Sequence, residues 1–419
     1  MYTVSSLSSG LRVLTAPGDG TAAVTVHVFT GAGSRYERRN ERGISHFLEH
    51  MFFKGGKKYR STRDVSMAID SVGGDFNAFT GKEYAGYYVK VAAESVPLAC
   101  DVLSDMLLHA SFPATDIERE RGVIMEEERM YQDTPMYRAG WDFEELLFGD
   151  HPLGWDTIGT EKVIRSVTQK DFSAYKHLLY TPDNLVLVFA GKIAEREAMH
   201  LAKEYFSPLS GKKKRVFEPF LKFEQKKLFL RTKATEQAHL VLGVPAVSAL
   251  DPDHFAHKLL AIILGGNMSS RMFLNIREAK GLCYYISTET DSYLDAGVLS
   301  TRAGVDQSRL SEAIADIVRE YKICAAKGIS EDELVRAKSF LKGKMTLGLE
   351  DSEEQAHFYG KQLLLYPEVR DTQQYFAEID RVTRSQVNAL AKKILVPEKL
   401  HLVVIGKEDD SEKLGKLMK

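Results

Sequence analysis

The sequence predicts an α+β fold of two similar halves, each a mixed β-sheet packed with helices. Segments with the two-residue alternation of strands, such as Val24, Val26 and Val28, are interleaved with segments of helical periodicity. Predicted strands often follow one another directly, which favours α+β over strictly alternating α/β. A third observation is a pattern of residues that recurs at a constant spacing.

The repeat has an offset of 215 residues. Residues 166–168, Thr181-Pro182, 185–188 and Gly191 recur as residues 381–383, Val396-Pro397, 400–403 and Gly406. Because self-similarity at a fixed spacing marks a duplicated unit, we expect homologous domains at 1–210 and 227–419. Residues 211–226 include the basic run Lys212–Arg215 and are predicted to be an exposed linker.

The elements of the first half can be placed from turn signals and periodicity. Strands are expected at 10–16, 22–30, 76–80 and 84–91, and helices at about 45–53, 61–71, 95–109 and 114–130. The same offset sets Lys342 opposite Glu127, and the second half contains no counterpart of the histidine motif described below.

Composition excludes several classes of protein. With 419 residues and 44% apolar residues the chain can bury substantial cores, while a net charge of −2 argues against nucleic-acid or membrane-surface binding. No apolar segment reaches the length of a membrane span, and residues 1–20 show no secretory signal pattern. Three cysteines, an odd number without short spacing, indicate reduced thiols and a cytoplasmic location.

The run from Ser45 to Phe53 carries the main chemical signal. On a helix, His46, Glu49 and His50 face the same way because they are three and four residues apart. Two imidazoles suit a catalytic zinc, which needs a third protein ligand and an open position for water, and Glu49 is then the candidate base. The alternative is an apolar helix on which three such side chains coincide by chance. Burying them without a partner would cost several kcal/mol.

A third ligand is expected from the helix at 114–130. Glu120 and Glu127 are seven residues apart and share a face, whereas Glu126 and Glu128 point elsewhere. A solvated acidic face is the alternative for this charge run, and it is favoured for Glu126 and Glu128.

The motif His46-x-x-Glu49-His50, with Glu127 placed 76 intervening residues after His50, resembles that of the pitrilysin-type inverted zinc peptidases. The resemblance covers nearly the whole chain and is closest to the processing-protease branch, which includes the mitochondrial processing peptidase. It implies one zinc per chain, held by His46, His50 and Glu127. It further implies that Glu49 activates the water and that Glu120 orients a ligating histidine.

The second half contains Gly265-Gly266-Asn267, followed by Arg277 and Tyr284. Paired glycines suggest a turn that opens a helix, but the lysine of a phosphate-binding loop is absent. Family members carry an arginine and a tyrosine seven residues apart, and Arg277 and Tyr284 fit that spacing. The resemblance implies that both hold the substrate backbone and stabilise the oxyanion. Asn267 stands where relatives commonly have a third glycine.

The resemblance also implies an endopeptidase that cleaves short or unfolded peptides inside a closed chamber, of which one chain forms half. A peptide would add as an extended strand along the edge formed by Phe76, Asn77, Ala78, Phe79 and Thr80. We expect a homodimer in which each site is completed by the partner chain. The alternative is a non-catalytic structural or partner subunit, since the fold family includes such members.

Overall fold

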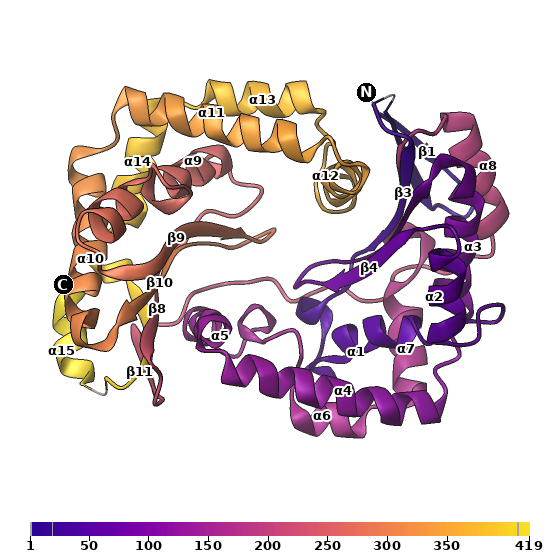
Figure 1. The fold of residues 1–419 in the computed structure, drawn as a ribbon, viewed down its shortest axis with the longest axis horizontal. Helices are drawn as coiled ribbons and strands as arrows, with labels where there is room; N and C mark the ends of the chain where they lie inside the picture. Colours follow the sequence, from indigo (N-terminus) through magenta and orange to yellow (C-terminus); the bar gives the residue numbers. More distant parts are fainter. Residues whose placement is uncertain (1, 19, 409) are drawn as a thin grey trace. The chain divides into compact units, whose positions relative to one another are not determined.

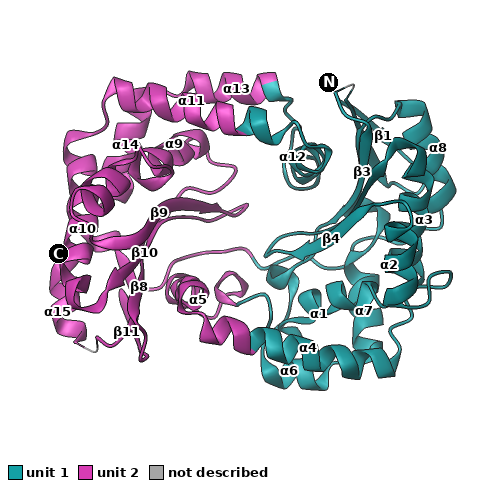
Figure 2. Cartoon of the chain, viewed as in Figure 1, with its two compact units in different colours: residues 1–128, 156–218, 345–372 teal, residues 129–155, 219–344, 373–419 magenta. Residues whose placement is uncertain are grey.

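The computed structural model describes residues 2–18, 20–408 and 410–419, which form two compact units (Figures 1 and 2). The first unit comprises residues up to Glu128, 156–218 and 345–372; the second comprises residues 129–155, 219–344 and 373–419. Each unit is a β-sheet packed with helices, so the predicted α+β class is confirmed. The expected domain boundaries follow the repeat along the chain and stay a prediction.

The first unit contains a six-stranded mixed sheet with the order β1-β2-β6-β3-β5-β4. Its strands are β1 Thr3–Ser6, β2 Arg12–Pro17, β3 Ala23–Thr30, β4 Asp75–Thr80, β5 Ala85–Ala92 and β6 Leu185–Gly191. Only β2 and β6 run parallel; the other pairs are antiparallel. Helices of this unit are α1 Ile44–Phe52, α2 Thr62–Asp70, α3 Val96–His109, α6 Glu161–Ser166, α7 Gln169–Leu179, α8 Glu195–Phe206 and α12 Ser352–Leu365.

The second unit repeats this topology without a counterpart of β1. Its sheet has the order β7-β11-β8-β10-β9, and again one pair, β7 with β11, runs parallel. The strands are β7 Leu228–Thr232, β8 Gln237–Ala246, β9 Cys283–Ser292, β10 Gly297–Asp306 and β11 His401–Gly406. Helices are α5 Pro135–Phe148, α9 His254–Gly265, α10 Leu310–Lys327, α13 Thr372–Arg381, α14 Arg384–Ile394 and α15 Ser411–Leu417, with a π-helical segment at Phe273–Glu278.

Two long helices pass from one unit to the other. Helix α4, Ala114–Asp133, begins in the first unit and ends in the second, and helix α11, Glu331–Gly348, does the reverse. Within the described residues, every helix is too short or too polar to cross a bilayer.

The repeat seen in the sequence has the same local structure in both copies. Thr168 and Asp171 form a capping box at the start of α7, and Thr383 forms one with Gln386 at the start of α14. In each box the side chains satisfy backbone N–H groups that have no partner within the helix. A short 3₁₀ turn and the strand β6 or β11 follow. The repeated residues therefore encode one helix–turn–strand unit.

The halves of the sequence exchange one helix each. Helix α5, from the first half, buries Phe143 and Leu147 against Val241 and Val403 of the second sheet. Helix α12, from the second half, places Ala356 and Tyr359 in a cluster with first-sheet residues Leu14, Phe29, Val186 and Val188. Figure 2 accordingly colours α12 with the first unit and α5 with the second. Each sheet is thus covered by a helix that is distant in sequence.

The predicted linker contains no helix or strand, but it is attached to the first unit as far as residue 218. Arg215 forms a two-pronged ion pair with Glu41, at 2.6 and 3.1 Å, and the guanidinium of Arg35 lies 3.9 Å from the centroid of the Phe217 ring. Lys212 and Lys214 are exposed, as predicted, whereas Arg215 is largely buried. The expectation of a wholly exposed linker is therefore wrong at Arg215, because its charge is paired.

Candidate metal centre

The start of helix α1 is fixed by backbone geometry. Gly43 has a φ of 95°, and a Cβ there would lie 2.1 Å from the carbonyl oxygen of Ile158, so only glycine fits. The Glu37 carboxylate accepts hydrogen bonds from the backbone N–H groups of Gly43 and Ser45, both at 2.8 Å. Burial raises the pKa of Glu37 to about 8 although these bonds lower it. The helix that carries the predicted ligands therefore begins in one defined place.

One face of α1 is core and the other carries the polar groups. Phe47, Leu48, Met51 and Phe52 are all buried. This apolar face anchors the helix, since burying one such side chain contributes about 1.5–3 kcal/mol. His46, Glu49 and His50 lie off that face and are only partly buried, as the three- and four-residue spacing predicts.

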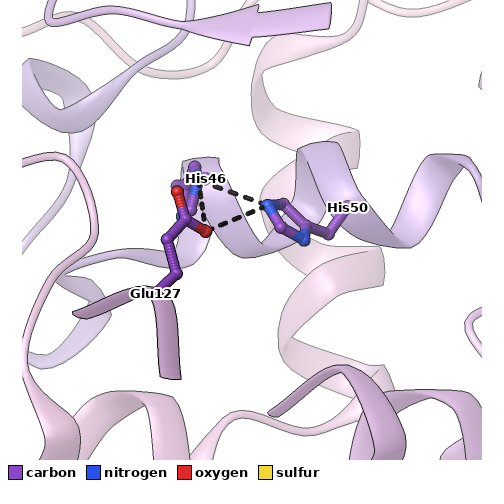
Figure 3. Close-up of side chains that lie close together, drawn as sticks. All are labelled: His46, His50 and Glu127. Atoms are coloured by element: carbon purple, nitrogen blue, oxygen red, sulfur yellow. Dashed lines mark hydrogen bonds and ion pairs between the residues drawn. The ribbon is translucent and has the colours of Figure 1, made fainter. Parts of the chain in front are cut away.

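The three predicted ligands converge, as Figure 3 shows. The Nε2 atoms of His46 and His50 are 3.3 Å apart, and Oε2 of Glu127 lies 3.7 Å from the first and 3.6 Å from the second. A point equidistant from these three atoms lies about 2.1 Å from each, which is the length of a zinc–nitrogen or zinc–oxygen bond. Among the described residues no other group of three ligating side chains comes together.

The chemistry of the donors also fits zinc. Two imidazole nitrogens and one carboxylate form the three-ligand set of a catalytic site, in which a fourth position is left for water. Glu127 comes from α4, and burial together with the charge of Glu120 raises its pKa, against the effect of His50. A divalent cation would favour the ionised carboxylate and the unprotonated nitrogens that the geometry brings together.

Glu120 lies within hydrogen-bond distance of His50. Its Oε1 is 2.9 Å from Nδ1 of His50, and because a carboxylate only accepts hydrogen bonds, Nδ1 is the donor of this pair. Lys54 forms an ion pair with the other oxygen of Glu120. Burial lowers the pKa of His50, but the bond to Glu120 and the charges of Glu49, Glu127 and Glu120 outweigh it and raise the pKa overall.

His46 has a different environment from His50. Burial and the nearby His50 lower its pKa to about 3, so its ring is neutral near pH 7. Its Nδ1 is buried without a hydrogen-bond partner among the described residues. The two histidines therefore differ: burial favours the neutral ring of His46, whereas the neighbouring carboxylates favour the protonated ring of His50.

Glu49, the candidate base, is hydrogen-bonded to a residue of the first sheet. Its Oε2 accepts a hydrogen bond from the hydroxyl of Thr80, the last residue of β4. Burial raises the pKa of Glu49, and the bond from Thr80 and the charge of His50 only partly offset this. A general base is most effective when its pKa approaches the working pH, and burial moves Glu49 in that direction.

The remaining predicted residues are placed as follows. Phe76, Asn77, Ala78, Phe79 and Thr80 all lie in β4, which is the last strand in its sheet. Arg277 lies in the π-helical segment, with its guanidinium 4.6 Å from the centroid of the Phe273 ring. Tyr284 is near the start of β9 and is 77% exposed. Both belong to the second unit, whereas the predicted metal ligands belong to the first.

Sequence analysis did not identify three contributors to the site: Lys54, Glu37 and the hydrogen bond from Thr80. Lys54 follows His50 by four residues but lies beyond the last residue of α1, so helical spacing does not place it. Glu37 and the bond from Thr80 to Glu49 depend on tertiary contacts that no local spacing reveals. At the position equivalent to Glu127, Lys342 instead pairs with Asp380 at 2.7 Å.

Comparisons with known proteins identify the family of this chain. The model of the family described as Insulinase (Peptidase family M16) matches residues 12–160, and that described as Peptidase M16 inactive domain matches residues 166–341. The protein named uncharacterized zinc protease YmxG of Bacillus subtilis (strain 168) is 34% identical over 390 residues, covering 93% of this chain and 95% of that protein.

Solved structures share the fold. The structure of a protease from Helicobacter pylori has a TM-score of 0.89 at 21% identity and covers 97% of this chain and 99% of that one. A chain in complex III2 from Candida albicans, with Inz-5 bound, has a TM-score of 0.84 at 16% identity, and the match covers 99% of each chain.

Fold and site together define an α+β protein with an inverted zinc-peptidase motif. This chain belongs to peptidase family M16, the insulinase or pitrilysin family, and its relatives are named zinc proteases.

Proposed function

We propose that this chain is a zinc-dependent endopeptidase that cleaves short or unfolded peptides. The observation that carries the proposal is the convergence of His46, His50 and Glu127 beside Glu49. Two imidazole nitrogens and a carboxylate would hold the ion, and a second carboxylate one residue from a ligand would serve as base. A presequence-processing role, as in the branch that the sequence resembles, is one form of this activity.

Bound zinc would supply Lewis-acid activation of a water molecule and of the scissile carbonyl. Glu49 accepts the proton of the attacking water and returns it to the leaving amine. The hydroxyl of Thr80 holds one oxygen of this carboxylate. Glu120 keeps the proton of His50 on Nδ1, so that Nε2 stays free of a proton.

The substrate is proposed to bind as an extended strand along β4. Support comes from the position of β4 at the end of its sheet, where it pairs with β5 on one side. A peptide added to such an edge is held through its backbone, which selects conformation more than side-chain identity. Because Thr80 both ends this strand and bonds to Glu49, a peptide on β4 would lie beside the base.

Arg277 and Tyr284 are proposed to donate to the substrate backbone and to the oxyanion, in a homodimer in which each chain completes the site of the other. The exposed ring of Tyr284 supports a role outside the core of its own unit. Mixing Glu49→Gln protein with Tyr284→Phe protein tests the arrangement. Activity should return on subunit exchange, whereas no recovery despite demonstrated exchange would exclude it.

A second candidate is a non-catalytic subunit of the same fold. It is favoured by the likeness to a chain of complex III2 and by the match of residues 166–341 to the inactive-domain model. That match lies mostly in the half without the histidine motif, whereas the ligands and base fall within the match at 12–160. The three free, buried cysteines fit a cytoplasmic location under either proposal.

The deciding experiment compares wild type with Glu49→Gln, and with Glu126→Gln as the control on α4. All three proteins should bind one zinc per chain by elemental analysis, because none of the changes removes a ligand. Wild type and the control should cleave a quenched peptide in a chelator-sensitive manner, and Glu49→Gln should be at least a hundredfold slower. Full activity of zinc-loaded Glu49→Gln, or absence of zinc from wild type, would refute the proposal.

A further inference from the structure

The first unit contains a cavity of about 360 Å³ that none of the metal-site residues lines. Its wall is formed by the chain before β2, by β3 and β6, by residues 107–112, by α7, and by the end of α8. Ligand pockets in proteins commonly have volumes of about 300–1,000 Å³. The cavity is thus large enough for a small organic molecule.

The wall of the cavity is mixed. Apolar side chains such as Leu107, Phe112 and Leu209 contribute to it, and its polar residues are His109, Ser173, Lys176, His177, Thr181 and Ser210. No aspartate or glutamate is among the residues that line the cavity. A cavity lined by both apolar and polar side chains can hold an organic ligand that has both kinds of surface.

Lys176 on α7 brings a positive charge to this wall. Its Nζ donates a hydrogen bond to the carbonyl oxygen of Leu108 at 3.0 Å and lies 6.0 Å from the centroid of the Phe112 ring. An ammonium group has three donors, so donors remain for an anion. Burial lowers the pKa of Lys176 to about 8, which reflects the cost of holding this charge in an apolar place.

Backbone strain occurs at the same wall. Phe112 has a φ of 51° and is the only residue other than glycine with a positive φ among the described residues. Such a conformation costs of order 1–3 kcal/mol and is often found at ligand sites. Here it accompanies a ring that lines the cavity and packs 5.9 Å from that of Phe52, on the core face of α1.

We propose that this cavity binds a medium-chain aliphatic carboxylate, with the carboxylate at Lys176 and the chain against the apolar side chains of the wall. The charge and the apolar surface match the two ends of such a ligand. Its site is separate from the metal centre, so binding does not require that the chain be a peptidase.

The test is isothermal titration calorimetry of the full chain with decanoate below its micellar concentration. Decanol supplies the chain without the charge, and acetate the charge without the chain. We expect one decanoate per protein and at least tenfold weaker binding of either control molecule. Absence of saturable decanoate binding, or equal affinity for decanoate and decanol, would overturn the proposal.

Variants of cavity residues test whether decanoate binds in this cavity. Lys176→Met should weaken decanoate binding at least tenfold, whereas Lys176→Arg should retain it within about threefold, so a loss in the methionine variant alone reports the charge. Lys170→Met, an exposed lysine of the same helix, is the matched control and should bind like wild type. Ala110→Phe, which adds a ring at the cavity wall, should also abolish binding. Unchanged binding in both Lys176→Met and Ala110→Phe would place the ligand elsewhere.

Discussion

The hydroxyl of Thr80 donates a hydrogen bond to Oε2 of Glu49, which ties the end of strand β4 to the helix that carries two of the proposed metal ligands. The candidate base is therefore positioned by the same strand that is proposed to bind the substrate. Its orientation depends on β4 as well as on α1.

Thr80→Val should lower kcat about tenfold without loss of zinc. Valine keeps the shape of threonine but removes the donor, and a hydrogen bond to a charged group is worth about 1.5–3 kcal/mol. Steady-state kinetics with a quenched peptide, together with zinc analysis, measures this. Thr80→Ser should restore most of the rate, and a Thr80→Val enzyme with wild-type kcat would contradict the role.

Glu120→Gln should weaken zinc binding by about 10–100-fold. The variant loses the charged acceptor that fixes the proton of His50 on Nδ1 and leaves Lys54 without its ion pair. Competition with a fluorescent zinc chelator gives the affinity. Glu118→Gln removes an exposed acid from the same helix and should bind zinc like wild type; an equal loss in both variants would indicate a general effect of charge.

Gly360→Ala should lower the free energy of unfolding by about 1–3 kcal/mol. A Cβ at Gly360 would lie 2.2 Å from the ring of Phe29, a fully buried residue of β3, so α12 would have to move away from the sheet. Urea denaturation measures the change. Gly343→Ala in α11 meets nothing within 4 Å and should instead stabilise by about 0.5–1 kcal/mol. Destabilisation by both changes would refute the packing argument.

The ion pair of Glu333 and Arg271 should make the free energy of unfolding depend on pH in the acidic range. Burial would raise the pKa of Glu333, but two hydrogen bonds from Arg271, at 2.6 and 2.8 Å, and one from the backbone of Ser330 lower it to about 2. Since the folded-state pKa is below the unfolded value of 4.5, the pair contributes fully above that pH and loses its contribution as the pH falls towards 2.

Glu333→Gln should therefore cost about 2–3 kcal/mol at pH 7, and the difference from wild type should shrink between pH 4.5 and 2. Denaturant unfolding across this pH range provides the measurement. Glu331→Gln, an exposed acid at the start of the same helix, should have little effect at any pH. A difference for Glu333→Gln that persists unchanged at low pH would show that charge is not its cause.

Much of the first half could be predicted because its signals are local. The predicted helix at 95–109 ends at the observed residue, and the predicted strand at 22–30 differs from β3 by one residue. Capping residues, turn glycines and periodicity act over a few residues. The spacing of His46, Glu49 and His50 likewise fixed a shared helix face, and the structure brings Glu127 to it.

The exchange of α5 and α12 could not be predicted in the same way. An amphipathic helix shows in its sequence that one face is buried, but not which sheet covers that face. The segment after Gly265-Gly266 was expected to form a turn that opens a helix, and part of the helix that follows, Phe273–Glu278, is π-helical, a detail that the sequence did not indicate. Phe273 and Ile276 of this segment are buried.

Helix α5 of the first half covers the second sheet, and helix α12 of the second half covers the first. This exchange has a consequence for a chain that is cleaved between its halves. A break within residues 211–226 would give two fragments, each with a bare sheet face and a helix whose apolar side has nothing to cover. Each fragment alone would expose the surface that drives aggregation. Produced in the same cell, the fragments should reconstitute one another, so this protein is suited to split-reporter designs in which association restores the native molecule.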